Sequence, residues 1–360
     1  MGVPASGKID KTSLHNHKQA SVGSFRILGS MFTLYRQLNK QEQYLNNYLP
    51  LLLTPIIPGD FQTFFAPHFK RTTKYWQLSL NLVCDNLYQL TGQTLQLHEQ
   101  QRIILLSVFG PLFDDLFDDR ILNHDQITSL VTQPETYVPI NPTDRFVKAI
   151  YLELLRLTPR RQQFMEVLQE VTRWQQASLK QLNDSITEEE LYQITYNKSY
   201  FAVLLYCAVL DHYPNQEILD MLYPIAGLMQ LTNDAFDVYK DVHHGVYTLP
   251  NLYRNFDKLQ QRFMAEVALI NHILWQLPYP ARAKQTYGIT IHSLFAMGWM
   301  ALEQLQEVTA GISTLDQLKA MSRKALVCDM DTAAQKVKWL RHIKRLTNYR
   351  ADIEPSIREL

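Results

Sequence analysis

Glycine and cysteine are scarce in this sequence, which has 12 glycines and 3 cysteines in 360 residues. Cys84, Cys207 and Cys328 are far apart and form no CxxC pair. Their spacing argues against a disulfide framework and against a structural zinc site, and it suits a reducing cytoplasm. Alternation of apolar and polar residues with a period of two is also rare, so half-buried β-strands are not expected.

An excess of either charge is absent as well, because 35 basic residues balance 35 acidic ones. No overall field would attract nucleic acid, and charge-driven chemistry must come from local clusters. The longest apolar runs, such as YFAVLLYCAVL at 200–210, are far shorter than the roughly 20 residues that cross a bilayer. The start of the chain is too polar for a signal peptide. We therefore expect a cytoplasmic protein with no nucleic-acid partner and no stable membrane insertion.

Helical periodicity, by contrast, runs through most of the chain, with apolar residues at i, i+3 and i+4. The expected helices span 27–48, 60–91, 96–120, 143–157, 160–182, 187–212, 215–243, 257–276, 280–310, 315–328 and 331–350. This pattern predicts an all-α protein whose helices surround one core.

Several of the expected helices have recognisable ends. Thr187 with Glu190 has the pattern of a capping box at a helix N-terminus. Gly92, Gly245 and Gly311 lie where C-terminal caps are expected.

No internal repeat or low-complexity linker divides the chain. We expect a polar N-terminal tail at 1–24, one large helical domain at 25–350 and a short C-terminal tail at 351–360. Within the first tail, VPASGKIDKTSL (Val3 to Leu14) resembles the last motif of peptide-synthetase adenylation domains. In that family the lysine matching Lys8 contacts the acyl-adenylate. The rest of such a domain is absent, so we assign this segment no catalytic role.

The segment FGPLFDDLFDDR (109–120) places four aspartates beside phenylalanines. On a helix, Asp114 pairs with Asp118, and Asp115 with Asp119, each pair about 6 Å apart along the axis. Carboxylates this close repel one another unless cations or water satisfy them. Mg²⁺ suits such oxygen ligands and keeps enough waters to share a diphosphate with the protein.

Two positions in a helix are open for these acids. Pro111 could start a helix, which would put Asp114 and Asp115 near the first turn, where the helix dipole favours negative charge. The apolar run RIILLSVFG immediately before instead favours a buried helix that continues through a kink at Gly110-Pro111. The acids would then lie at its far end.

A second polar stripe occurs in GLMQLTNDAFDVYKDVHHGVYTLPN (227–251). Asn233, Asp237 and Asp241 are spaced i, i+4, i+8 and project from one side of a helix over about 12 Å. One amide and two carboxylates are a plausible oxygen-ligand set for Mg²⁺. A solvated helix face is the alternative for each stripe taken alone, but two stripes in one all-α chain favour a shared metal site.

These two segments resemble the motifs of the class I isoprenoid synthases, which include terpene cyclases, polyprenyl diphosphate synthases and squalene/phytoene synthases. Residues 114–118 match the DDxxD motif. Residues 230–250 are similar to the squalene/phytoene pattern QLTNxxxDxxxDxxxGxxYLP. The resemblance implies a single helical bundle around a central apolar cavity. Relatives occur as monomers and as homodimers, so both states stay open.

The resemblance also implies roles for individual residues. Asp114 and Asp118 would bind two Mg²⁺ ions, supported by Asp115. A third ion would bind to Asn233, Asp237 and Asp241. These ions would grip an allylic prenyl diphosphate, so that its C–O bond ionises.

Basic and aromatic residues complete the expected site. Lys198 would contact the diphosphate, with an ordinary surface lysine as the alternative. Arg120 and Lys240 are weaker candidates that could instead screen the acids. Aromatic faces stabilise carbocations, and the candidate lining residues, each of which could also be ordinary core, are Phe113, Phe117, Tyr196, Tyr200, Phe236 and Trp299.

Differences between this sequence and the family pattern decide which functional hypothesis is preferred. Chain-elongating synthases carry basic residues for a second diphosphate. Here the upstream counterparts are only Lys70 and Arg71 in APHFKRTTKYW, and no arginine pair follows the first motif. The leading hypothesis is therefore a terpene synthase that ionises one substrate and then cyclises or quenches the cation. The alternatives are a prenyltransferase, coupling two prenyl groups or extending one, and a non-catalytic helical protein that binds a prenyl chain or a partner.

Overall fold

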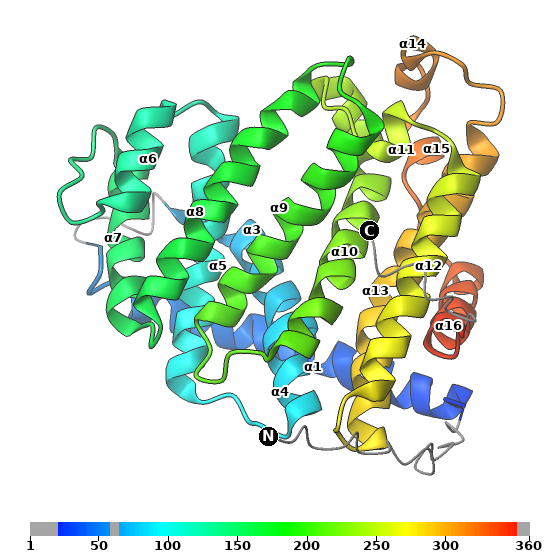
Figure 1. Ribbon diagram of the computed structural model, residues 1–360, viewed down its shortest axis with the longest axis horizontal. Coiled ribbons are helices and arrows are strands. Elements are labelled where there is room, and N and C mark those ends of the chain that lie inside the picture. Colours follow the sequence, from blue (N-terminus) through cyan, green and yellow to red (C-terminus); the bar gives the residue numbers. More distant parts are fainter. Residues whose placement is uncertain (1–20, 58–64, 351–360) are drawn as a thin grey trace, which may run out of the picture.

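The computed structural model describes residues 21–57 and 65–350, and within these ranges it contains helices and no strand. The helices pack into one bundle (Figure 1). The all-α prediction is therefore confirmed. The GKID segment at 7–10 and the C-terminal tail at 351–360 lie outside the described residues. None of the described helices is both long and apolar enough to cross a membrane.

Among the described residues, nine long helices build the bundle. They are α1 (Ser24–Leu53), α5 (Leu97–Asp118), α7 (Pro142–Leu157), α8 (Arg161–Ser178), α9 (Glu188–Ala208), α10 (Gln216–His244), α12 (Phe256–Gln276), α13 (Ala281–Val308) and α16 (Ala333–Thr347). Shorter elements join them: η1 (Ala66–His68), α3 (Phe69–Leu78), η2 (Ser79–Cys84), α4 (Asp85–Thr91), α6 (His124–Thr132), η3 (Leu179–Leu182), α11 (Leu249–Leu252), α14 (Leu315–Lys319) and α15 (Arg323–Leu326).

Local signals explain most of these boundaries. Thr187 and Glu190 form the expected reciprocal capping box. Gly92 and Gly245 adopt the left-handed conformation that ends a helix, with φ of 76° and 69°. Gly311 does not, because α13 ends at Val308 and its C-cap is Thr309. The expectation of a glycine cap there was wrong.

Three further expectations about helices need correction. The span 315–328 is two short helices, because the Ser322 side chain caps a new start at α15. Helix α6 was missed, although Asn123 and Gln126 form a capping box before it. The part of 60–91 that the structure describes is divided by η2, a π-helical segment between α3 and α4. Such bulges frequently occur at functional sites.

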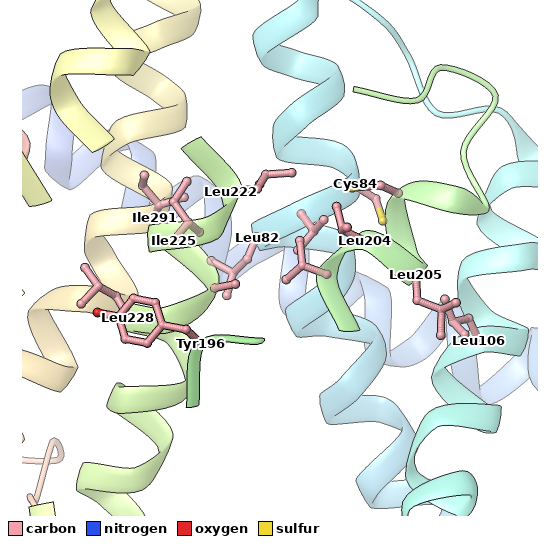
Figure 2. Packing of buried hydrophobic residues seen from close by; sticks show 14 of the residues in the cluster. Leu82, Cys84, Leu106, Tyr196, Leu204, Leu205, Leu222, Ile225, Leu228 and Ile291 are labelled. Atoms are coloured by element: carbon pink, nitrogen blue, oxygen red, sulfur yellow. The ribbon is translucent and has the colours of Figure 1, made fainter. Parts of the chain in front are cut away.

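Apolar side chains from five elements meet in the core. Figure 2 shows Leu82 of η2, Leu106 of α5, Leu204 of α9, Ile225 of α10 and Ile291 of α13 among the side chains that fill the space between the helices. All five are buried. Because the long helices share this one core, their ends are held at fixed positions relative to one another.

Two glycines let α10 approach its neighbours closely. A Cβ atom at Gly227 would overlap the Tyr196 ring of α9, and one at Gly298 of α13 would overlap the Thr232 side chain of α10. Only a residue without a side chain fits at either place. These close contacts fix the position of α10 between α9 and α13. Thr232 lies immediately before the second acidic stripe.

Substitution of Gly298 by alanine tests the close contact between α13 and α10. The new methyl group must displace Thr232 or separate α13 from α10, so we expect Gly298→Ala to lower the free energy of unfolding by about 1–3 kcal/mol. Gly29→Ala is the matched control, since Gly29 also lies in a helix and has nothing within 4 Å of its Cβ position. That control should be neutral or slightly stabilising. Chemical denaturation measures the free energy of unfolding of both variants. Equal values would contradict the role of Gly298 in the contact between α13 and α10.

Candidate active site

The first acidic motif lies at the C-terminal end of α5. The helix continues through Pro111 and ends at Asp118, with Asp119 as its C-cap. The alternative in which Pro111 starts a helix and the acids lie in its first turn is therefore wrong. At a helix C-terminus the dipole disfavours negative charge, so the helix itself gives no reason for acids here.

Residues of two neighbouring helices contact this motif. Arg71 of α3 forms an ion pair with Asp115, with 2.5 Å between Nη1 and Oδ1. Tyr75, one turn further along α3, donates its hydroxyl to Asp114 Oδ2 at 3.2 Å. The amide of Gln175 on α8 donates to Asp118 Oδ1 at 3.4 Å. Tyr75 and Gln175 were not among the predicted site residues, because no local pattern marks their approach to α5.

Exposure divides the first motif into two parts. Asp114 and Asp115 are half-buried, whereas Asp118, Asp119 and Arg120 are exposed. Burial raises the pKa of Asp114, and the positive charge of Lys198 opposes that rise. Residues of α3 thus hold Asp114 and Asp115, whereas Asp118 is exposed to solvent and contacts only Gln175 among the residues described above.

The second stripe lies toward the C-terminal end of α10, with Asp241 in the last turn. Asn233 is exposed, and its amide lies 3.5 Å from Asp237 Oδ2, the limit of a hydrogen bond. Burial raises the pKa of Asp241 to about 7, and the charges of Asp234 and Asp237 add to the rise. Both motifs therefore end their helices with carboxylates that repel one another.

Asp234 belongs to this group, although the prediction omitted it. Its side chain is 4% exposed, and burial raises its pKa to about 7. Gln230 donates to Oδ1 at 2.8 Å, while Oδ2 has no well-formed hydrogen bond within the described residues. The spacing i, i+3, i+7 puts Asp234, Asp237 and Asp241 within about 60° around the helix axis. This spacing is visible in the sequence and could have identified Asp234 as a member of the site.

The charge of Lys198 on α9 acts on both acidic groups. Its positive charge lowers the pKa of Asp114 on α5 and also the pKa values of Asp234 and Asp241 on α10. Lys198 is half-buried, and its ammonium group makes no hydrogen bond or ion pair with residues 21–57 or 65–350. One lysine is therefore within electrostatic range of both motifs and keeps its donors available.

Two separate pockets open beside the motifs. Phe117 and Arg120 line one of about 650 Å³ next to the first motif. Phe236, Asp237 and Lys240 line another of about 450 Å³ next to the second. Neither of these two pockets contains a residue of the other motif. The structure thus gives each motif its own opening to solvent, with some of the predicted aromatic and basic residues in the walls.

The other predicted aromatic residues are part of the helix packing. Phe113 and Trp299 are buried, and the Trp299 indole donates to Glu303 one turn further along α13 at 2.7 Å. Tyr196 is buried beneath α10. The half-buried ring of Tyr200 has its centroid 5.2 Å from that of Tyr223.

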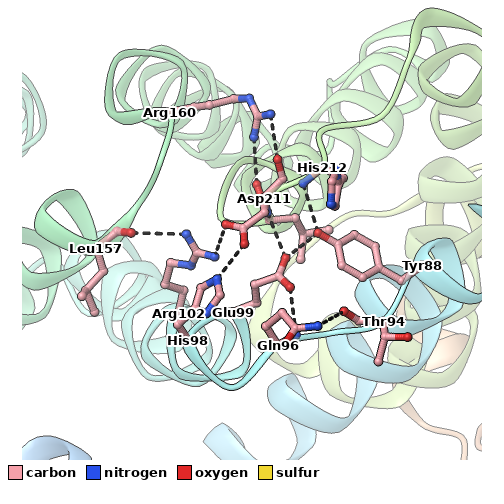
Figure 3. Close-up of polar contacts among 11 residues, drawn as sticks. Tyr88, Thr94, Gln96, His98, Glu99, Arg102, Leu157, Arg160, Asp211 and His212 are labelled. Atoms are coloured by element: carbon pink, nitrogen blue, oxygen red, sulfur yellow. Dashed lines mark hydrogen bonds and ion pairs between the residues drawn. The ribbon is translucent and has the colours of Figure 1, made fainter. Parts of the chain in front are cut away.

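A third cluster, which lies at the opposite end of α5 from the first motif, consists of His98, Glu99 and Asp211 (Figure 3). Its carboxylates already have partners. Asp211 accepts from the buried Arg102 and from His98, at 2.6 Å each. Glu99 accepts from two backbone amides and from the Tyr88 hydroxyl. Because the arginine supplies the positive charge, the cluster is better suited to joining the start of α5 to the α9–α10 loop than to holding a metal ion.

Comparison with known proteins adds no assignment. No protein-family model matches this chain, and no curated protein matches it either. The chemistry of the site therefore rests on the side chains and contacts above.

The raised pKa of Asp234 predicts a pH dependence of stability. A carboxyl group with a pKa of about 7 when folded, against about 3.9 when unfolded, binds its proton more tightly in the folded state. Its contribution to stability is complete below about pH 4 and is lost as pH rises to about 7. In metal-free buffer, Asp234→Asn should therefore exceed wild type in free energy of unfolding by at least about 1 kcal/mol at pH 8, and by less at pH 5.

Asp220→Asn is the control for this measurement, because Asp220 is an exposed acid on the same helix. Its difference from wild type should stay constant between pH 5 and pH 8. The burial argument for Asp234 fails if both variants give the same pH profile.

Proposed function

We propose that this protein is a Mg²⁺-dependent class I terpene synthase, which ionises an allylic prenyl diphosphate and then cyclises or quenches the carbocation. The proposal includes an isoprenoid-synthase-like bundle with a central apolar cavity. The observation that carries it is the position of Lys198, whose charge acts on acids of both motifs. An amine whose charge reaches two acidic helix ends is suited to a diphosphate, because the amine can bind the phosphate oxygens while the acids bind the accompanying metal ions.

The residues fit a divalent hard cation. Asp114 and Asp118 offer oxygens from α5, and Asp234, Asp237 and Asp241 offer them from α10. The Oδ2 atom of buried Asp234 has no well-formed hydrogen bond within the described residues and is available as a metal ligand. Bound Mg²⁺ would neutralise the charge that develops on the departing diphosphate.

The protein's own side chains would orient the substrate and keep it from water. The ion pair with Arg71 holds Asp115, and the Tyr75 hydroxyl holds Asp114. Lys198 would donate hydrogen bonds to diphosphate oxygens, with Arg120 and Lys240 at the two pocket mouths. The apolar packing behind Asp114, including Phe113 and Phe117, would exclude water from the cation.

One contact favours a single-substrate reaction over chain elongation. Arg71, one of the two upstream residues that could serve a second diphosphate, is paired with Asp115. It is therefore less available to bind a second diphosphate. A prenyltransferase stays the alternative that the following experiment separates.

Turnover assays test the proposal directly. The full chain is incubated with Mg²⁺ and geranyl, farnesyl or geranylgeranyl diphosphate, first alone and then with isopentenyl diphosphate. We expect a hydrocarbon or alcohol and pyrophosphate from one of these substrates alone. Asp114→Asn and Lys198→Gln should lower kcat by at least about 100-fold, because each removes a group that stabilises charge in the transition state.

Asp119→Asn is the matched control, since Asp119 is exposed and caps α5 without a side-chain contact in the described structure. It should keep activity within about threefold of wild type. Product that forms only with isopentenyl diphosphate would establish chain elongation, and a condensed product from two allylic molecules would establish coupling. An absence of turnover with every substrate would favour a non-catalytic binding protein.

Thermal unfolding tests the metal site without relying on turnover. Mg²⁺ at about 100 times its Kd should stabilise wild type by about 2.7 kcal/mol. In EDTA, Asp118→Asn and Asp241→Asn should unfold at higher temperature than wild type, because each substitution removes a negative charge at a helix C-terminus. The same variants should respond less to Mg²⁺. Metal-free variants that are less stable than wild type would contradict the site.

A further inference from the structure

Helix α1 carries exposed apolar side chains along one side. Phe25, Leu28, Phe32 and Tyr35 are 92%, 48%, 63% and 65% exposed. Their spacing of three and four residues places them in one stripe about 15 Å long. Helix α1 lies across the lower part of the bundle in Figure 1, where it contacts α3, α13 and α16. Monomeric proteins rarely expose such a continuous apolar surface without a partner for it.

Basic residues follow one edge of this α1 stripe. Arg26, Arg36 and Lys40 are the charged residues between 24 and 41, and the first acid of the helix is Glu42. The Arg36 guanidinium lies 5.8 Å from the centroid of the Phe32 ring. Aromatic and aliphatic side chains bordered by positive charge are typical of helices that lie in the interface of an anionic membrane.

Beside the stripe, α1, α4 and α13 enclose a polar pocket of about 570 Å³ that contains Arg26 and Arg282. The Arg26 guanidinium donates to the Arg282 carbonyl at 2.9 Å and to the Thr286 hydroxyl at 3.4 Å, both neutral acceptors. Burial and the charge of Arg282 lower the pKa of Arg26. Asp85 also lines this pocket, yet neither arginine forms an ion pair with a described residue. Two unpaired guanidinium groups are suited to phosphate.

We propose that the α1 stripe docks this protein on the surface of a negatively charged lipid bilayer, with lipid phosphates at the pocket of Arg26 and Arg282. The apolar side chains enter the interface between headgroups and acyl chains. A second copy of this chain is a poorer occupant, because an interface between two such faces would bring like charges together. The inference is independent of the diphosphate chemistry at α5 and α10.

Co-sedimentation of the full chain with vesicles tests this surface. We expect binding to vesicles of phosphatidylcholine with phosphatidylglycerol, weaker binding to phosphatidylcholine alone, and weakening by salt. Phe25→Ser/Phe32→Ser should lower binding by more than about tenfold, because it removes two apolar anchors. Leu51→Ser is the matched control, since Leu51 is an exposed apolar residue of α1 outside the stripe. It should bind like wild type.

Removal of the two guanidinium groups tests the pocket separately. Arg26→Gln/Arg282→Gln should lose roughly fivefold for each charge on the anionic vesicles, with little change on phosphatidylcholine. Circular dichroism checks that each variant is folded. Equal binding of wild type and Phe25→Ser/Phe32→Ser would overturn the proposal. The proposal would also be overturned if wild type did not bind vesicles and instead formed a dimer in analytical ultracentrifugation that these two substitutions dissociate.

Discussion

The rest of this structure depends on one constraint, which is that carboxylates gather at the ends of two helices and the charge of Lys198 acts on both groups. Asp118 ends α5 and Asp241 lies in the last turn of α10, so each faces both neighbouring acids and the negative end of its own helix dipole. Lys198 on α9 acts on both groups but is paired with neither within the described structure. Such an arrangement is unfavourable without a bound cation, and it persists because packing elsewhere holds the three helices in place.

That packing is visible at particular contacts. Gly227 of α10 leaves room for the Tyr196 ring of α9, and Gly298 of α13 leaves room for the Thr232 side chain of α10. These close contacts fix the helix that carries the second stripe. At the opposite end of α5, Glu99 and Arg102 join the helix to the loop before α10 through Asp211. The polar network around Asp211 anchors the start of α5. The close contacts at the two glycines position α10 along its length.

Net charge gives little indication of where charge acts in this molecule. Basic and acidic residues balance over the chain, yet acids gather at the ends of α5 and α10 while the first half of α1 is basic. The two regions would serve different partners: cations and a diphosphate at the acids, and lipid phosphates at α1. Because screening confines surface electrostatics to about 10 Å, separate local clusters of this kind act independently even in a chain that is neutral overall.

The sequence alone determined the helical class, most helix boundaries, and both acidic stripes, because helical periodicity, caps and i, i+4 spacing are local properties of the chain. It also left two placements open for the acids of 114–119, and only the continuous helix through Pro111 decided between them. Tertiary structure alone decided that Arg71, Tyr75 and Gln175 contact the first motif, and that Lys198 lies within reach of both. It also decided that Asp234 is buried with the second stripe and that Trp299 belongs to the helix packing. These outcomes depend on which helix faces lie against one another, and that is set by the fit of side chains across the whole core, which no short stretch of sequence contains.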